Sequence, residues 1–206
     1  MARPRKQDEL NIPEKAVKAA IHLINSRNCL DFTMAEIARE VGCSAPALYN
    51  HFADKDELLR IVQSKIIKDS RAEKQARYSI HAKVDAFANL REGGLNYVKF
   101  ARDNPVIYRL VYGHFSDNDE DNFGIPRELI SELAKGIRAC QAQGLGFFLD
   151  PEKTAKLLWS AVHGAVLLAM DAKFPGDEET RWREAFQVVD TVMDLLNNHQ
   201  YPAKRG

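Results

Sequence analysis

Residues 33–58 read TMAEIAREVGCSAPALYNHFADKDEL and hold the most specific pattern in the chain. Thr33 and Glu36 stand three residues apart at its start, a pattern typical of the capping box that opens a helix. Gly42 predicts the end of that helix, and Ser44 can cap a second one that carries Pro46 in its first turn. The sequence therefore predicts two short helices joined through Gly42, a helix-turn-helix over residues 33–52.

The spacing of apolar side chains predicts which face of this motif is buried. Ile37, Val41 and Leu48 are apolar where they must pack inward, and Ala38 is small where the two helices cross. A second helix packed in this way presents its outer face to a DNA major groove. The side chains expected on that face are Ser44, Ala45, Ala47, Tyr49, Asn50 and His51. On spacing alone, two core helices that meet at a glycine turn remain an alternative.

Helix signals continue on both sides of the motif. A first helix is expected to begin at Asn11, which can cap it, and to stop at Asn28. The second short helix is expected to span 45–52. Asp54 and Glu57 then repeat the capping arrangement and open a fourth helix towards Tyr78.

Beyond residue 80 the sequence predicts longer amphipathic helices, near 82–102, 104–114, 126–143, 151–172 and 178–199. Asn104-Pro105 and Asp150-Pro151 are expected to start two of them, and Gly93-Gly94 is expected to kink or interrupt another. Neither an alternating strand pattern nor an internal repeat is found in the sequence. The predicted fold is all-α with about nine helices: an N-terminal three-helix helix-turn-helix domain followed by a larger helical domain.

Charge limits the kind of nucleic-acid contact that is possible. The 206 residues include 29 Lys and Arg and 29 Asp and Glu, so the chain is not a nonspecific polycation. Residues 1–60 likewise hold nine basic and nine acidic side chains. Arg3, Arg5 and Lys6 cluster in residues 1–10, a flexible basic arm that either enters a minor groove or is a disordered tail. Few phosphate contacts predict a shallow dependence of DNA affinity on salt.

The sequence also bears on the compartment of the protein. Cys29, Cys43 and Cys140 have spacings that suit neither a zinc site nor a disulfide framework, which favours reduced thiols. No apolar stretch follows the basic arm as it would in a secretory signal, and the uncharged run 157–170 is too short to cross a bilayer. We expect a cytoplasmic protein without membrane contact. A redox role for Cys140 stays open beside a buried, inert thiol.

The stretch 33–58 closely resembles the DNA-binding signature of TetR-family transcriptional regulators. The matching residues are Thr33, Ile37, Ala38, Gly42, Ser44, Leu48, Tyr49, His51, Phe52, Lys55 and Leu58. The resemblance implies a DNA-binding domain over 11–71 and an effector-binding and dimerisation domain over 72–201. It also implies that Tyr49, His51 and Lys55 contact phosphates. Thr33 and Ser44 lie at helix starts, where backbone amides favour phosphate oxygens.

Base reading is expected from the residues that depart from the family pattern. Ala45 and Pro46 replace polar or glycine residues that are common there, so the recognition helix has no Arg or Lys for a guanine edge. Asn50 is the best candidate for a bidentate contact to adenine, and Ala45 and Ala47 are candidates to meet thymine methyl groups.

The C-terminal part resembles the family more weakly, through WSAVHGAVLLAM (159–170), which looks like its Trp-x-x-x-His-Gly type. The family implies a homodimer through the apolar helices near 151–172 and 178–199, bound to double-stranded operator DNA. It also implies a pocket for a small, mainly hydrophobic effector in this part of the chain. The expected lining residues are Tyr97, Tyr108, Tyr112, Trp159 and His163.

Enzymatic readings have little support in the sequence. Ser160 and His163 lie three residues apart without an orienting acid, so no catalytic group is expected. The six histidines form no HxxxH pair, so no metal is expected, and no cofactor is expected either. Three hypotheses follow. The first is a homodimeric repressor released from its operator by an effector. The second is a helix-turn-helix regulator that acts with a protein partner and has no effector. The third is a helical enzyme or carrier with a helix-turn-helix-like segment.

Overall fold

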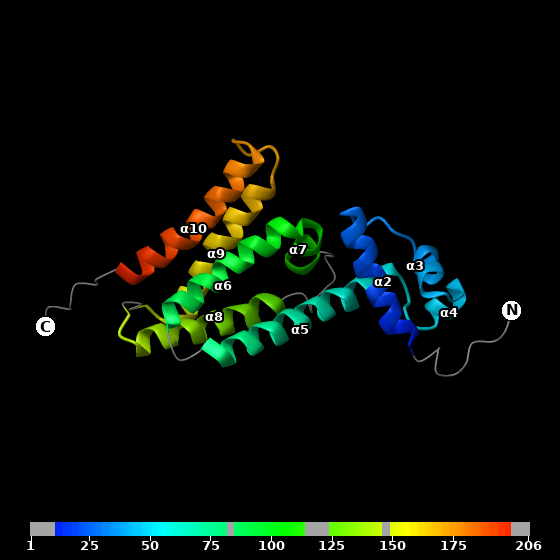
Figure 1. Cartoon of the computed structure of the whole chain (residues 1–206), viewed down its shortest axis with the longest axis horizontal. Coiled ribbons are helices and arrows are strands. Elements are labelled where there is room, and N and C mark those ends of the chain that lie inside the picture. The colour runs from blue at the N-terminus through cyan, green and yellow to red at the C-terminus, as the bar shows by residue number, and fades with distance from the viewer. Residues whose placement is uncertain (1–10, 82–84, 114–123, 146–148, 199–206) are drawn as a thin grey trace, which may run out of the picture. The chain divides into compact units, whose positions relative to one another are not determined.

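The computed structural model describes residues 11–81, 85–113, 124–145 and 149–198. Within these ranges the chain forms nine α-helices and no β-strand, which confirms the all-α prediction (Figure 1). The helices divide between two compact units: residues 1–76 with 104–114, and residues 77–103 with 115–206. None of the described helices combines the length and the apolar composition needed to cross a membrane.

The first unit begins with α2 (Ile12–Arg27), α3 (Met34–Val41) and α4 (Ala45–Tyr49), which pack on one another (Figure 1). Asn28 ends α2 in the left-handed conformation, φ 47°, as predicted. Asn11 precedes α2, but its side chain makes no capping hydrogen bond, so that detail of the prediction is wrong. The backbone carbonyl of Asn11 accepts from the Lys15 amide instead, at 3.0 Å.

Helix α4 is shorter than the predicted 45–52. After Tyr49 the amides of His51 and Phe52 both donate to the Leu48 carbonyl, a turn that ends the helix. Phe52 is thereby buried, and Asp54 then accepts from the Glu57 amide at 2.7 Å to open α5 (Lys55–His81). The core of this unit is built from side chains with almost no exposed surface: Ile24, Ile37, Leu48, Phe52, Leu58 and Val62.

Helix α7 (Pro105–Tyr112) belongs to the first unit. It contacts α2, and the buried side chain of Gln63 on α5 donates to its Val111 carbonyl at 3.2 Å. The predicted C-terminal domain, 72–201, includes α7, whereas α7 belongs to the first compact unit. The domain boundaries stay a prediction. The Asn104 side chain makes no capping hydrogen bond at the start of α7, contrary to the prediction.

The second unit contains α6 (Ala86–Asp103), α8 (Gly124–Ala142), α9 (Pro151–Met170) and α10 (Glu178–Asn198). Helices α9 and α10 run side by side as a hairpin (Figure 1), and α8 packs on α9 and α6. Asp150 caps α9 as predicted, accepting from the Lys153 amide at 2.9 Å. Arg91 on α6 holds α10 through two hydrogen bonds to Asp190, at 2.5 and 3.0 Å.

The expected interruption at Gly93-Gly94 is wrong, because α6 runs unbroken through both residues. The reason lies in packing: a Cβ at Gly94 would stand 2.8 Å from Cγ1 of Val189, a fully buried side chain on α10. The glycine therefore allows the two helices to approach closely. The gain in packing with α10 offsets the low helix propensity of glycine.

We expect Gly94→Ala to destabilise the protein by about 1–3 kcal/mol, because the stiff Val189 side chain has no room to move. The double variant Gly94→Ala/Val189→Ala should recover part of the first loss, since it removes the clashing methyl groups. Urea unfolding followed by circular dichroism measures both effects. A Gly94→Ala protein at least as stable as the wild type would contradict the packing role of this glycine.

Candidate DNA-binding surface

The N-terminus of α3 is held by a complete capping box. The Thr33 hydroxyl accepts from the Glu36 amide at 3.2 Å, and a Glu36 carboxylate oxygen accepts from the Thr33 amide at 2.8 Å. The other Glu36 oxygen pairs with Arg27 of α2 at 2.8 Å. The Arg27 hydrogen bond, followed by the hydrogen bonds from Thr33, lowers the pKa of Glu36 to about 2. Thr33 is exposed, but its amide and hydroxyl serve the helix cap.

The turn between α3 and α4 is fixed by its backbone. Gly42 adopts φ 79°, a left-handed conformation that glycine adopts readily, and its amide donates to the carbonyls of Ala38 and Arg39. The exposed Ser44 caps α4 by accepting from the Ala47 amide at 3.3 Å. Both predictions are confirmed. They fix the direction in which the five-residue helix leaves the turn.

The exposed face of α4 differs in part from the predicted one. Tyr49 is 51% exposed, and Asn50 and His51 beside it are exposed as well. Ala45 and Ala47 are half-buried, whereas Pro46 is exposed.

Helix geometry explains the difference. Pro46 lies about 160° around the helix from the buried Leu48, whereas Ala45 and Ala47 lie about 60° and 100° from it. This angular count was available in the sequence and would have identified Pro46 as an outward residue.

Lys55 is turned partly inward. Its ammonium donates to the Leu30 carbonyl at 2.6 Å and lies 4.6 Å from the centre of the Phe32 ring. Lys55 therefore fastens the loop between α2 and α3 to the start of α5. The sequence gave no signal for this contact, because the hydrogen-bonded partner stands 25 residues away. A phosphate contact by Lys55 stays a prediction, as do the contacts assigned to Thr33, Ser44, Tyr49, Asn50 and His51.

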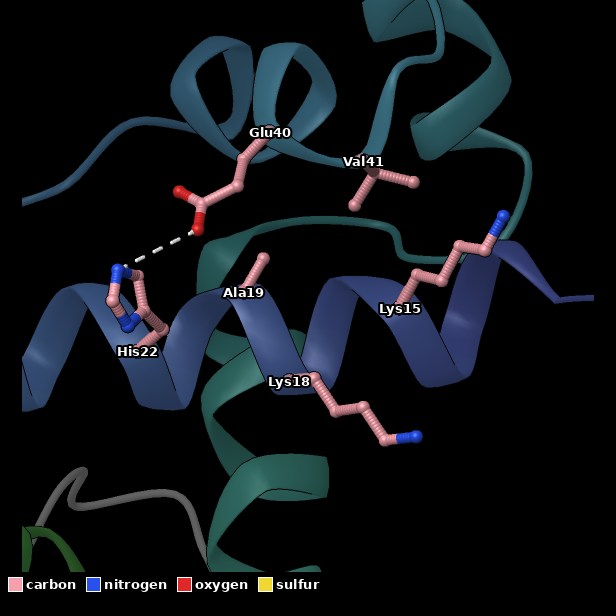
Figure 2. A pocket seen from close by; sticks show the side chains of 6 residues that line it. All are labelled: Lys15, Lys18, Ala19, His22, Glu40 and Val41. Carbon is pink, nitrogen blue, oxygen red and sulfur yellow. Dashed lines mark ion pairs between the residues drawn. The ribbon is translucent and has the colours of Figure 1, made fainter.

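An open hollow lies between α2 and α3 (Figure 2), lined by Lys15, Lys18, Ala19, His22, Glu40 and Val41. His22 and Glu40 face each other at 4.0 Å across it, both in contact with solvent. The ammonium groups of Lys15 and Lys18 point in different directions (Figure 2). Lys18 pairs with Glu14 at 2.7 Å. The cations do not converge on one point, so the hollow is not built as an anion site. Arg3, Arg5 and Lys6 of the arm lie outside the described residues.

The five expected effector residues fall into two groups. Tyr97, Trp159 and His163 lie together in the second unit: the Tyr97 hydroxyl is 2.9 Å from His163 Nδ1, and the Trp159 and His163 rings stack at 4.7 Å. Tyr108 and Tyr112 lie on α7 in the first unit, with ring centres 5.0 Å apart. Burial raises the pKa of Tyr112 to about 12.

The Cys140 thiol was the candidate for a redox role. Cys140 is fully buried, and burial raises the pKa of its thiol to about 11, which keeps the thiol protonated and favours the inert reading. Among the described residues, no three His, Cys, Asp or Glu side chains are grouped to hold a metal ion.

Two family models match the chain over separate stretches. Residues 16–62 match the model described as bacterial regulatory proteins, tetR family, and residues 90–189 match the model described as tetracyclin repressor-like, C-terminal domain. The chain belongs to the TetR family. It is therefore a DNA-binding transcriptional regulator and not an enzyme, and the α3–α4 motif is the family's helix-turn-helix.

Individual relatives and structural neighbours are distant in sequence. The nucleoid occlusion factor SlmA of Klebsiella pneumoniae (strain 342) is 26% identical over 177 residues, which cover 79% of this chain and 86% of that protein. A TetR-family regulator from Pectobacterium atrosepticum shares the fold with a TM-score of 0.74 and 20% identity, over 95% of this chain and 99% of that one. Thermus thermophilus FadR, a TetR-family repressor solved with lauroyl-CoA, has a TM-score of 0.65 and 18% identity. The match covers 94% of this chain and 100% of that one.

The capping box predicts a specific pH dependence. The pKa of Glu36 is lowered in the folded protein, so its contribution to stability is present above its ordinary pKa near 4.5 and is lost as the pH falls towards 2. We expect Glu36→Gln to be less stable than the wild type at pH 7 and the gap to close between pH 4.5 and 2, in urea titrations at each pH. Glu40→Gln is the matched control. A gap that does not change with pH would show that the charge of Glu36 does not matter.

The exposed end of α4 predicts two different DNA-binding defects. Asn50→Ala should relax base preference at one position of the selected site, because a bidentate contact discriminates by about 1–3 kcal/mol. Tyr49→Phe should weaken binding to DNA of every sequence by a similar factor, because phosphate contacts carry little sequence information. Selection from random duplexes followed by titration measures both, with His22→Ala as a control on α2. If Asn50→Ala selects duplexes with the same base preferences as the wild type, Asn50 does not read a base.

Proposed function

We propose that this TetR-family protein is a homodimeric repressor that binds two operator half-sites and is released by a small, mainly hydrophobic effector. The proposal rests on large apolar side chains of α9 and α10 that are exposed. Leu157 and Leu168 of α9 are 53% and 47% exposed, and Leu195 of α10 is 59% exposed. Exposed leucines on two helices that pack on each other are typical of a surface that another protein covers, and we call this surface the α9–α10 face.

The same face has room for close contact with a second copy. Leu157, Ala161, Gly164 and Leu168 follow one another at helical spacing on α9. A Cβ on Gly164 would meet nothing within 4 Å, so the backbone there is open to an approaching helix. A two-fold pairing of this face through α9 and α10 buries the leucines of both protomers at once.

A dimer of this kind accounts for DNA recognition by a nearly neutral chain. Two α4 helices occupy two half-sites, and each half-site contributes the contacts of Ser44, Tyr49, Asn50 and His51. Thr33 and Lys55 add phosphate contacts next to their structural bonds, and Ala45 and Ala47 lie close enough to the surface to meet thymine methyl groups. Binding to both half-sites then supplies the affinity that one protomer lacks.

The effector is assigned to Tyr97, Trp159 and His163, which lie together in the second unit. The effector contacts expected of Tyr108 and Tyr112, on α7 in the first unit, stay predictions. FadR supports the assignment, because that repressor shares the fold and was solved with lauroyl-CoA. An effector releases DNA only to the extent that it binds the released conformation more tightly than the DNA-bound one.

The second candidate is a regulator that acts with a protein partner and takes no effector. Its support is the similarity of this chain to proteins named nucleoid occlusion factor. In both candidates the protein acts on DNA in the cytoplasm.

We expect Leu157→Glu to convert the dimer to a monomer and to weaken operator binding by more than tenfold, because it places two charges in the buried interface. Leu149→Glu is the matched control, since Leu149 is 40% exposed but lies outside α9 and α10. Size-exclusion chromatography with light scattering measures the oligomer. A Leu157→Glu dimer, or a monomeric wild type, contradicts pairing through this face.

A gel shift on an operator selected from random duplexes separates the two candidates. Titration with a library of small hydrophobic compounds should release the DNA for at least one compound. If the protein binds the operator and no compound releases it, the second candidate holds.

A further inference from the structure

Among the described residues of the second unit, one buried side-chain polar atom lacks a hydrogen-bond partner. The indole Nε1 of Trp159 on α9 is buried and has no hydrogen-bond acceptor in the part of the chain that the structure describes. Proteins pair the great majority of their buried donors, so each unpaired one needs a specific explanation. The indole N–H only donates, so the missing partner must supply a lone pair.

The side chains around this indole are held in fixed positions. His163, one turn further along α9, stacks on Trp159 with the two rings 15° from parallel. Tyr97 reaches across from α6 and its hydroxyl lies 2.9 Å from His163 Nδ1. The stacked pair is thus tied to a second helix, which sets the direction of the indole N–H before any ligand arrives.

The cluster carries no formal charge at neutral pH. Burial lowers the pKa of His163, so its ring is neutral, and the tyrosine and the indole are uncharged. A carboxylate or phosphate placed here would be desolvated without a cation from these three residues. An uncharged acceptor such as a ketone, ester or amide oxygen would satisfy the indole without that cost.

We propose that Trp159 Nε1 donates a hydrogen bond to an uncharged carbonyl oxygen of the effector, and that Tyr97 and His163 are positioning residues for the indole. The inference rests on the proposed function, because it names the chemical class of the effector. It assigns Trp159 as the polar contact of an otherwise apolar ligand.

The test uses three probes of similar shape: cyclohexyl methyl ketone, cyclohexanecarboxylate and ethylcyclohexane. The full-length protein is labelled with ¹⁵N-tryptophan, and its two indole N–H signals, from Trp159 and Trp182, are followed by NMR. In the Trp182→Phe protein the signal of Trp159 is the one indole signal that remains, which assigns it. This variant is also the matched control, since Trp182 lies on α10, outside the cluster of Tyr97, Trp159 and His163. The ketone should move the Trp159 proton downfield, the hydrocarbon should move it less, and the carboxylate should leave it unchanged.

Two variants complete the experiment. Trp159→Phe should weaken binding of the ketone about tenfold and leave binding of ethylcyclohexane within a factor of two. Tyr97→Phe should shift the Trp159 signal in the free protein and weaken binding of the ketone. If Tyr97 served only in packing, its replacement would leave the preference for the ketone over the hydrocarbon unchanged. The wild-type spectra decide the matter even if Trp159→Phe fails to fold.

A Trp159 signal that no probe moves, or that the ketone and hydrocarbon move equally, overturns the proposal. So does a Trp159→Phe protein that binds the ketone as the wild type does. These outcomes differ from failure of the proposed function, which appears as an operator complex that no compound of the library releases. If a compound releases the DNA equally well from the wild type and from Trp159→Phe, the result supports the proposed repressor function and contradicts a hydrogen bond from Trp159 to the effector.

Discussion

Burial of Leu48 is the constraint on which the DNA-binding surface depends. A helix of five residues is too short to be stable by its own hydrogen bonds, so α4 exists only because tertiary contacts hold it. Leu48 is fully buried between α2 and α3, and Phe52 is buried directly after the helix. The left-handed Gly42 and the Ser44 cap fix the other end. With both ends and one side fixed, Pro46, Tyr49 and Asn50 can only face outward.

The charges of this unit serve mainly to assemble it. Arg27 pairs with Glu36 across α2 and α3, and Lys55 binds the Leu30 carbonyl on the loop between them. Both contacts use a cation to hold the helices of this unit together. The DNA-binding surface therefore depends on shape, helix ends and pairing of two protomers more than on net positive charge. This agrees with the equal numbers of acidic and basic residues in the chain.

Most local features of the structure could be predicted from the sequence, the side-chain caps at Asn11 and Asn104 excepted, and features that depend on distant residues could not. The Thr33–Glu36 capping box and the Gly42 turn involve neighbouring residues, so their pattern is visible in the sequence. The unbroken course of α6 through Gly94 depends on Val189, and the position of Lys55 depends on Leu30, so neither was visible. The aromatic residues assigned to the effector were identified by type, but only the structure groups Tyr97 with Trp159 and His163.

We infer that the outer face of α4, held in place by Leu48, is the surface that meets DNA. Hydrogen–deuterium exchange of the full-length protein, with and without a duplex selected from a random library, tests it most directly. The claim predicts slower exchange on DNA binding in peptides from residues 33–58 and unchanged exchange in peptides from 151–170. Unchanged exchange in 33–58, with the protein fully bound to the duplex, would contradict it.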